Sequence, residues 1–257
     1  MQQTLQGLLQ GELFGFLMVF VRLGAAFLVM PTIGEGFVSP RVRLALGLIV
    51  AAAVAPTVRG VMPTVQADGA ALAGLILMET VIGLFIGTLA RIMLSALETA
   101  GSMIANQLGL ASAQVLNPAA GGQTNVLNSV LGISGLLLIM ATNLHHMLIH
   151  AAVDSYSVFR PGEILPLGDY TDLLTRVVGS SFVIGMQMSA PFVVLGLLFY
   201  LGLGLLARLV PQIQVFFVGL PIQIILGTAL LAFGMSAILM FWLSHFEDQV
   251  ITLMDFH

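Results

Sequence analysis

Glu79 is the residue whose position in this chain most strongly suggests chemistry. It lies inside an apolar run from Ile76 to Gly87, where a carboxylate is costly and normally faces protein or water. Gly83 and Gly87 follow at intervals of four, so in a helix all three lie near one face, which lets another helix approach closely. Arg91 continues this face but is too distant for direct pairing. Two interpretations stay open: a proton or ion site, or, as we favour, a salt bridge between subunits.

Arginine and glutamate also occur early in the chain. Arg22 lies within the first apolar run, where a buried guanidinium normally needs a carboxylate or carbonyl partner. Glu35 follows a break in this run, and with Arg41 and Arg43 it forms a small charged loop. Such a loop could dock a neighbouring protein or simply be solvated.

Three histidines are the candidates for metal binding. His146 and His150 are four residues apart, a spacing compatible with zinc on a helix, and His145 is adjacent. No carboxylate shares these turns, so we interpret the histidines as interfacial polar residues and expect no metal. The chain lacks H-E-x-x-H, G-x-S-x-G and, having no lysine, any Walker-type loop. We therefore expect no enzyme activity and no cofactor.

Composition places the chain in a membrane. Hydrophobic residues make up 58% and charged residues only 8%, against roughly a quarter charged in soluble domains. All eight basic residues are arginine, the net charge is −4, and no basic patch suggests nucleic acid. Cysteine is absent, which excludes disulfides and thiolate chemistry. The first four residues carry no basic side chain, so we expect no cleavable signal peptide.

The apolar runs predict an all-α membrane protein with about six helical segments, some of them broken. These runs are residues 13–31, 44–58, 70–94, 126–153, 174–209 and 213–246. The last two exceed the roughly 20 residues of one crossing and predict a long helical hairpin that turns at residues 209–211. If six crossings are assumed, the arginines fall almost evenly on the two sides and indicate no orientation.

Two polar stretches interrupt these runs. Residues 95–125 are small and polar, and Pro118 with Gly121 and Gly122 breaks any helix. We expect either a loop inside a pore or an ordinary extramembrane loop. Residues 211–223 carry two prolines and three glutamines but no charge. Because proline-broken backbone at membrane depth needs partners, this stretch predicts a packed turn or a seam against other protein.

These motifs together resemble the flagellar biosynthetic protein R family (FliR), whose relatives also serve in virulence type III secretion. The resemblance covers essentially the whole chain, and the stretch from Pro211 to Gln223 is its most specific part. The other matching patterns are Arg22…Pro31…Gly34…Pro40-x-x-Arg43, Glu79-x-x-x-Gly83-x-x-x-Gly87 and Gly101…Gln107-x-Gly109…Asn117-Pro118.

The resemblance implies a core subunit of the type III export gate in the bacterial inner membrane, within the flagellar basal body. Its implied partners are P-type and Q-type gate subunits, the B-type substrate-switching protein, unfolded flagellar export substrates and lipid. It also implies one membrane-type domain, 1–257, with a P-like part, 1–173, and a Q-like hairpin, 174–257.

The resemblance further implies two sets of site residues. A plug loop near 106–122 would narrow the closed pore, with Asn106, Gln107, Gly109, Leu110, Asn117, Pro118, Gly121 and Gly122 as its candidates. A second set would serve subunit assembly: Glu79, Gly83, Gly87, Arg91, Pro211, Gln212, Gln214, Phe216, Phe217, Gly219 and Pro221. The alternative function is a free-standing ion-coupled secondary transporter that uses Glu79, Arg91 and the histidines. We see no internal repeat that would support it.

Overall fold

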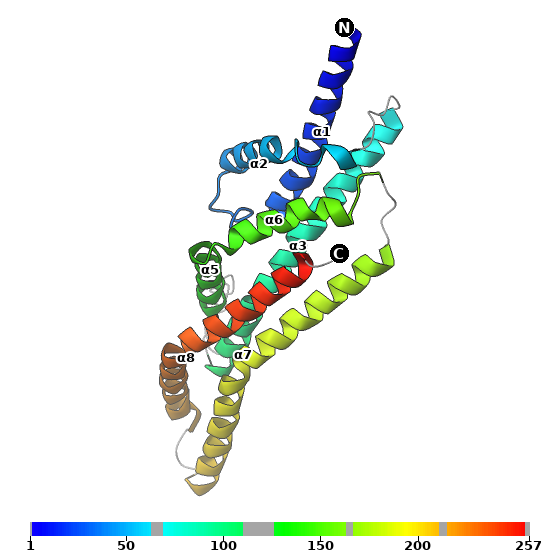
Figure 1. Ribbon diagram of the computed structural model, residues 1–257. Coiled ribbons are helices and arrows are strands. Elements are labelled where there is room, and N and C mark those ends of the chain that lie inside the picture. Colours follow the sequence, from blue (N-terminus) through cyan, green and yellow to red (C-terminus); the bar gives the residue numbers. More distant parts are fainter. Residues whose placement is uncertain (1, 63–68, 110–125, 163–166, 211–214, 255–257) are drawn as a thin grey trace. The chain divides into compact units, whose positions relative to one another are not determined.

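The computed structural model describes residues 2–62, 69–109, 126–162, 167–210 and 215–254, and these residues form helices (Figure 1). The α-helices are α1 (Gln2–Val29), α2 (Pro40–Val54), α3 (Gly69–Gln107), α5 (Val126–Ala141), α6 (Leu144–Val158), α7 (Leu167–Leu209) and α8 (Val215–Met254). A short 3₁₀ helix, η1, covers Arg59–Val61. No strand occurs in these ranges, so the predicted all-α class is confirmed.

Four helical segments are long and apolar enough to cross a membrane: Gly11–Val29, Gly69–Gln107, Tyr170–Leu209 and Gly219–Thr252. The bent pair α5 and α6 could supply a fifth. The assumption of six crossings is therefore too high for the described residues. Helix α2 accounts for the difference: its 15 residues extend only about 22 Å, less than the roughly 30 Å of hydrocarbon.

The predicted segment 126–153 is two helices, α5 and α6, which meet at an angle of 77°. Asn143 lies between them in the left-handed region, with φ of 61°. Asparagine adopts this conformation more readily than most residues. The break cannot be predicted from hydropathy, because a change in the backbone angles of one residue does not alter the apolar composition of the run.

The predicted C-terminal hairpin is present, with longer arms than the sequence indicated. Helix α7 has 43 residues and ends at Leu209, and α8 has 40. Pro221 lies within the second turn of α8, so the turn predicted for the 211–223 stretch gives way to helix by Val215.

The predicted loop at 95–125 is also partly wrong, because α3 continues to Gln107. The small polar side chains here are satisfied within the helix: the Thr99 hydroxyl donates to the Ser95 carbonyl at 2.9 Å, and the Ser102 hydroxyl to the Thr99 carbonyl at 2.8 Å, although such bonds do not themselves favour a helix. Gly101 faces α5 so closely that a Cβ there would lie 2.7 Å from the Asn128 Cα. Packing thus retains a helix that composition alone disfavours.

The chain divides into two compact units, each assembled from separate parts of the sequence. Unit 1 contains Met1–Met93, Ile139–Val177 and Glu247–His257, and unit 2 contains Leu94–Leu138 and Val178–Phe246. Phe14, Met18 and Leu75 form part of the unit 1 core. In unit 2, Trp242 and Leu97 are buried, and both would contact a Cβ at Gly135. The division into P-like and Q-like parts at residue 173 stays a prediction.

Candidate functional site

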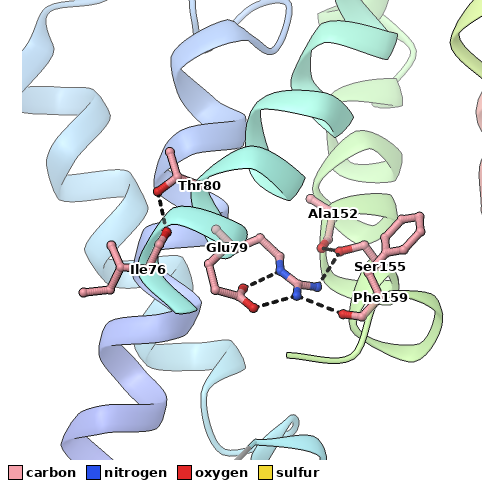
Figure 2. Close-up of polar contacts among 7 residues, drawn as sticks. Ile76, Glu79, Thr80, Ala152, Ser155 and Phe159 are labelled. Carbon is pink, nitrogen blue, oxygen red and sulfur yellow. Dashed lines mark hydrogen bonds and ion pairs between the residues drawn. The ribbon is translucent and has the colours of Figure 1, made fainter. Parts of the chain in front are cut away.

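Unit 1 contains a buried ion pair between Arg22 and Glu79 (Figure 2). The guanidinium Nε donates to Glu79 Oε2 at 2.6 Å, and Nη2 donates to Oε1 at 2.9 Å. Arg22 comes from α1 and Glu79 from α3, and both residues are 0% exposed. This two-point contact is the strongest geometry available to an arginine and a carboxylate.

Helix α6 completes the surroundings of Arg22. Nη1 donates to Ser155 Oγ at 3.3 Å and Nη2 donates to the Phe159 carbonyl, just beyond the helix end, at 2.9 Å. The Tyr156 ring lies under the guanidinium carbon at 3.8 Å, a cation–π contact. We name this group, Arg22, Glu79, Ser155, Tyr156 and the Phe159 carbonyl, the Arg22 cluster; it connects three helices.

The Arg22 cluster bears on the two interpretations of Glu79. Both carboxylate oxygens accept hydrogen bonds from Arg22, so its charge partner lies within the chain. The salt bridge of Glu79 thus lies within the chain, whereas the sequence favours one between subunits; a role of Glu79 in subunit assembly stays a prediction. The sequence could not select Arg22 as the partner because 57 residues separate the two. A carboxylate held at both oxygens by one cation suits a structural ion pair better than an exchanging proton site.

Gly83 and Gly87 provide the close approach that their spacing predicts. A Cβ at Gly83 would overlap the Arg22 carbonyl oxygen and lie 2.9 Å from the Ala25 Cβ. A Cβ at Gly87 would lie 2.6 Å from the Ala26 carbonyl oxygen. The glycines therefore let α3 lie directly against the backbone of α1, which brings Glu79 within reach of Arg22.

The charged loop before α2 is tied to its own unit. Arg43 Nε donates to the Ile33 carbonyl and Nη2 to the Glu35 carbonyl, both at 3.0 Å. The Glu35 carboxylate forms an ion pair with Arg91 of α3. Arg91 therefore has an intramolecular partner, like Glu79, while Arg41 is exposed.

In unit 2, the end of α3 is held by a residue that the site predictions missed. Gln223 of α8 donates from Nε2 to the Gln107 backbone carbonyl at 2.6 Å and to the Tyr200 hydroxyl at 3.2 Å. Gly109 follows the helix end with φ of 74°, a conformation that favours glycine. The spacing Gly219-x-x-x-Gln223-x-x-x-Gly227 is a usable signal, since it places a polar residue and two glycines at intervals of four, as at Glu79, Gly83 and Gly87, although in a different order.

The remaining predicted residues fall into three groups. Asn106 is exposed near the end of α3, Gly219 is buried, and Pro221 is exposed on α8. Phe216 and Phe217 lie in the first turn of α8. The others lie outside the described residues: Leu110, Asn117, Pro118, Gly121, Gly122, Pro211, Gln212 and Gln214.

The histidines do not assemble a metal site in the part of the chain that the structure describes. The rings of His145 and His146 lie 4.1 Å apart between centroids. No group of three or more His, Cys, Asp or Glu side chains there has a geometry that could hold an ion.

Helices of this length and apolarity define an integral, all-α membrane protein. Residues 13–249 match the family described as bacterial export proteins, family 1. The flagellar biosynthetic protein FliR of Caulobacter vibrioides is 38% identical over 231 residues, which cover 90% of this chain and 92% of the relative. FliR of Bacillus subtilis is 32% identical over 87% of this chain and 86% of the relative.

A relative with a different name is also similar to this chain over most of its length. The Yop proteins translocation protein T of Yersinia pestis is 27% identical over 96% of this chain and 94% of its own. The chain belongs to the FliR family of bacterial export proteins.

Proposed function

We propose that the chain is a core subunit of the flagellar type III protein export gate in the bacterial inner membrane. The observation that carries the proposal is the end-to-end match to the export family and to flagellar relatives. With P-type and Q-type subunits it would form the pore through which unfolded flagellar proteins pass. The B-type substrate-switching protein would bind the assembled gate.

The structure supports a role as one part of an assembly. Helices α7 and α8, at 43 and 40 residues, extend about 60 Å or more, roughly twice the thickness of the hydrocarbon. Large apolar side chains along α7 are exposed, among them Leu197, Leu201 and Leu205. Such surfaces require lipid or protein cover, and helices longer than the bilayer favour protein for part of it.

The residues on which the alternative, a free-standing secondary transporter, mainly depends are already paired within the chain. It used Glu79 and Arg91 as an ion or proton pathway, and both side chains are engaged by partners within unit 1. The charges act instead as connections between helices, a role that suits an assembly component.

The proposed plug loop, near 106–122, would close the pore between export events. Small uncharged residues suit this task because they pack closely and release an unfolded chain without holding it by charge. Residues 211–223 would serve assembly with neighbouring subunits.

The proposed function is tested by complementation. The chain is expressed in a flagellated host whose own member of the family has been deleted. We expect this chain to restore secretion of flagellar proteins into the medium, measured by immunoblot, and swimming in soft agar. A chain that reaches the membrane at native level but restores neither would contradict the proposal.

Native mass spectrometry provides the test of assembly. Expressed with P-type and Q-type subunits, the chain should form a discrete hetero-oligomer; expressed alone, it should be dispersed or unstable. A stable monomer or homodimer that ignores these partners would favour the transporter instead.

A further inference from the structure

The last residue of α3, Gln107, has its backbone carbonyl bonded by a side chain of another helix. The last turn closes with the Leu108 amide donating to the Ile104 carbonyl at 2.9 Å and the Gly109 amide to the Asn106 carbonyl at 3.1 Å. The Gln107 carbonyl accepts instead from the Gln223 side chain, at 2.6 Å. Carbonyls at a helix end need such partners when water is excluded.

Gln223 is buried at the point where it makes this bond. The residue is only 5% exposed, and Nε2 donates to two acceptors, the Gln107 carbonyl and the Tyr200 hydroxyl. Its two acceptors come from α3 and α7, while Gln223 itself belongs to α8. One amide group thus connects three helices of unit 2.

Glycines on α7 and α8 shape a socket around the same helix end. A Cβ at Gly196 would overlap the Gln107 Oε1 atom, and a Cβ at Gly227 would overlap the Leu108 side chain. Gly227 follows Gln223 by four residues and Gly196 precedes Tyr200 by four, so each glycine lies on the same face as its polar neighbour. A cavity of about 10 Å³ at this point, bordered by Gln107, Gln223 and Gly227 among others, has room for about one water-sized sphere.

We propose that Gln223, with Tyr200, is a positioning device that holds the end of α3 in a fixed place on the α7–α8 hairpin. We call these two residues the α3 cap. Its consequence for export rests on the proposed function, because Gln107 and Gly109 belong to the residues assigned there to the closed pore. The positioning itself concerns only described residues and is measurable without export.

A glutamine is chemically suited to this position. Leucine has a similar size but donates no hydrogen bond, so Gln223→Leu would remove this donor from the half-buried Gln107 carbonyl. An ionised glutamate at position 223 would place an acceptor against the Gln107 carbonyl oxygen, which is also an acceptor, so no hydrogen bond could form. Tyr200→Phe removes a single bond at a more exposed site and should have a smaller effect.

The absence of cysteine permits a direct test in the full chain, expressed with its gate partners and measured in membranes. Leu108→Cys places a thiol in the socket, where the native residue is 2% exposed, and Ala105→Cys places the control thiol in the body of α3, where the native residue is 0% exposed. The measurement is the rate of N-ethylmaleimide labelling, with and without Gln223→Leu.

We expect Gln223→Leu to raise labelling at position 108 about tenfold, the change that about 1.4 kcal/mol produces in an opening equilibrium, and to leave position 105 unchanged. Equal labelling at 108 in both backgrounds, or an equal rise at 105 and 108, would overturn the cap.

A nitroxide at Asn106→Cys, already exposed, supplies a second readout if the Leu108→Cys chain fails to accumulate. Its spectrum should narrow in the Gln223→Leu background as the helix end becomes mobile, and an unchanged spectrum would contradict the cap. If position 108 opens while export and ion leakage stay normal, the cap stands and the pore role assigned to the helix end fails.

Discussion

Arg22 and Glu79 show how a charge can be stable at membrane depth. Each is fully buried, and each is compensated: the carboxylate by two guanidinium hydrogen bonds, the guanidinium also by Ser155 and the Phe159 carbonyl. Removing one partner of such a pair leaves an uncompensated charge, which costs far more than losing both. The Arg22 cluster therefore fixes how three helices are arranged, and it adds less to the net free energy of unfolding.

We expect Glu79→Ala to destabilise the chain by about 3–5 kcal/mol, because it leaves Arg22 buried and unneutralised. The double variant Arg22→Met with Glu79→Leu should recover much of the loss. Thermal melting of the purified complex and the amount of chain in membranes measure both effects.

The chain offers a matched control in Glu12→Ala. Glu12 pairs with Arg59 at 3.0 Å, but the two side chains are 53% and 60% exposed, and exposed pairs contribute at most about 1 kcal/mol. If Glu79→Ala and Glu12→Ala melted alike, the Arg22 cluster would not hold unit 1 together.

Two glycines of α3 show that the effect of a glycine depends on what its Cα faces. Gly83 lies against the α1 backbone, whereas Gly74 of the same helix has nothing within 4 Å of an added Cβ. Both residues are glycine and so have the same helix propensity, but their surroundings differ. Substituting each by alanine therefore distinguishes the effect of packing on stability from the effect of helix propensity.

Gly83→Ala should destabilise the chain by about 1–3 kcal/mol or more, since the added methyl overlaps the Arg22 carbonyl oxygen and separates α3 from α1. Gly74→Ala should be neutral or stabilise by up to about 1 kcal/mol. The comparison is made by thermal melting and by protease resistance in membranes. Equal effects at both positions would contradict the close packing of α1 and α3.

The whole molecule is an integral membrane protein of the FliR family whose proposed role needs a barrier as well as a pore. Deletion of residues 117–122 tests that barrier. We expect the assembled complex carrying this deletion to conduct small ions in a planar bilayer, where the parent complex stays closed. Gly11→Ala, with open space around its Cβ, is the control and should stay closed. Conductance unchanged by the deletion would remove the plug assignment.

Some structure was accessible from the sequence because it depends on local properties. Hydropathy indicated the long C-terminal arms, and the Glu79-Gly83-Gly87 spacing indicated a close helix approach. The continuation of α3 to Gln107 was missed because Ser, Thr and Gly at 95–107 disfavour helix locally. The close packing of α5 against Gly101, which only the folded unit supplies, offsets that local preference.

Hydropathy along the chain is enough to identify a membrane protein, because the free energy of transfer out of water is summed over the residues of each helix and does not depend on their neighbours. Which charges meet depends on the folded structure. Arg22 finds Glu79 across 57 residues and Ser155 across 133, and Gln223 finds Gln107 across 116. Pairs so distant form only when helices pack, and packing depends on where glycines let two backbones come together.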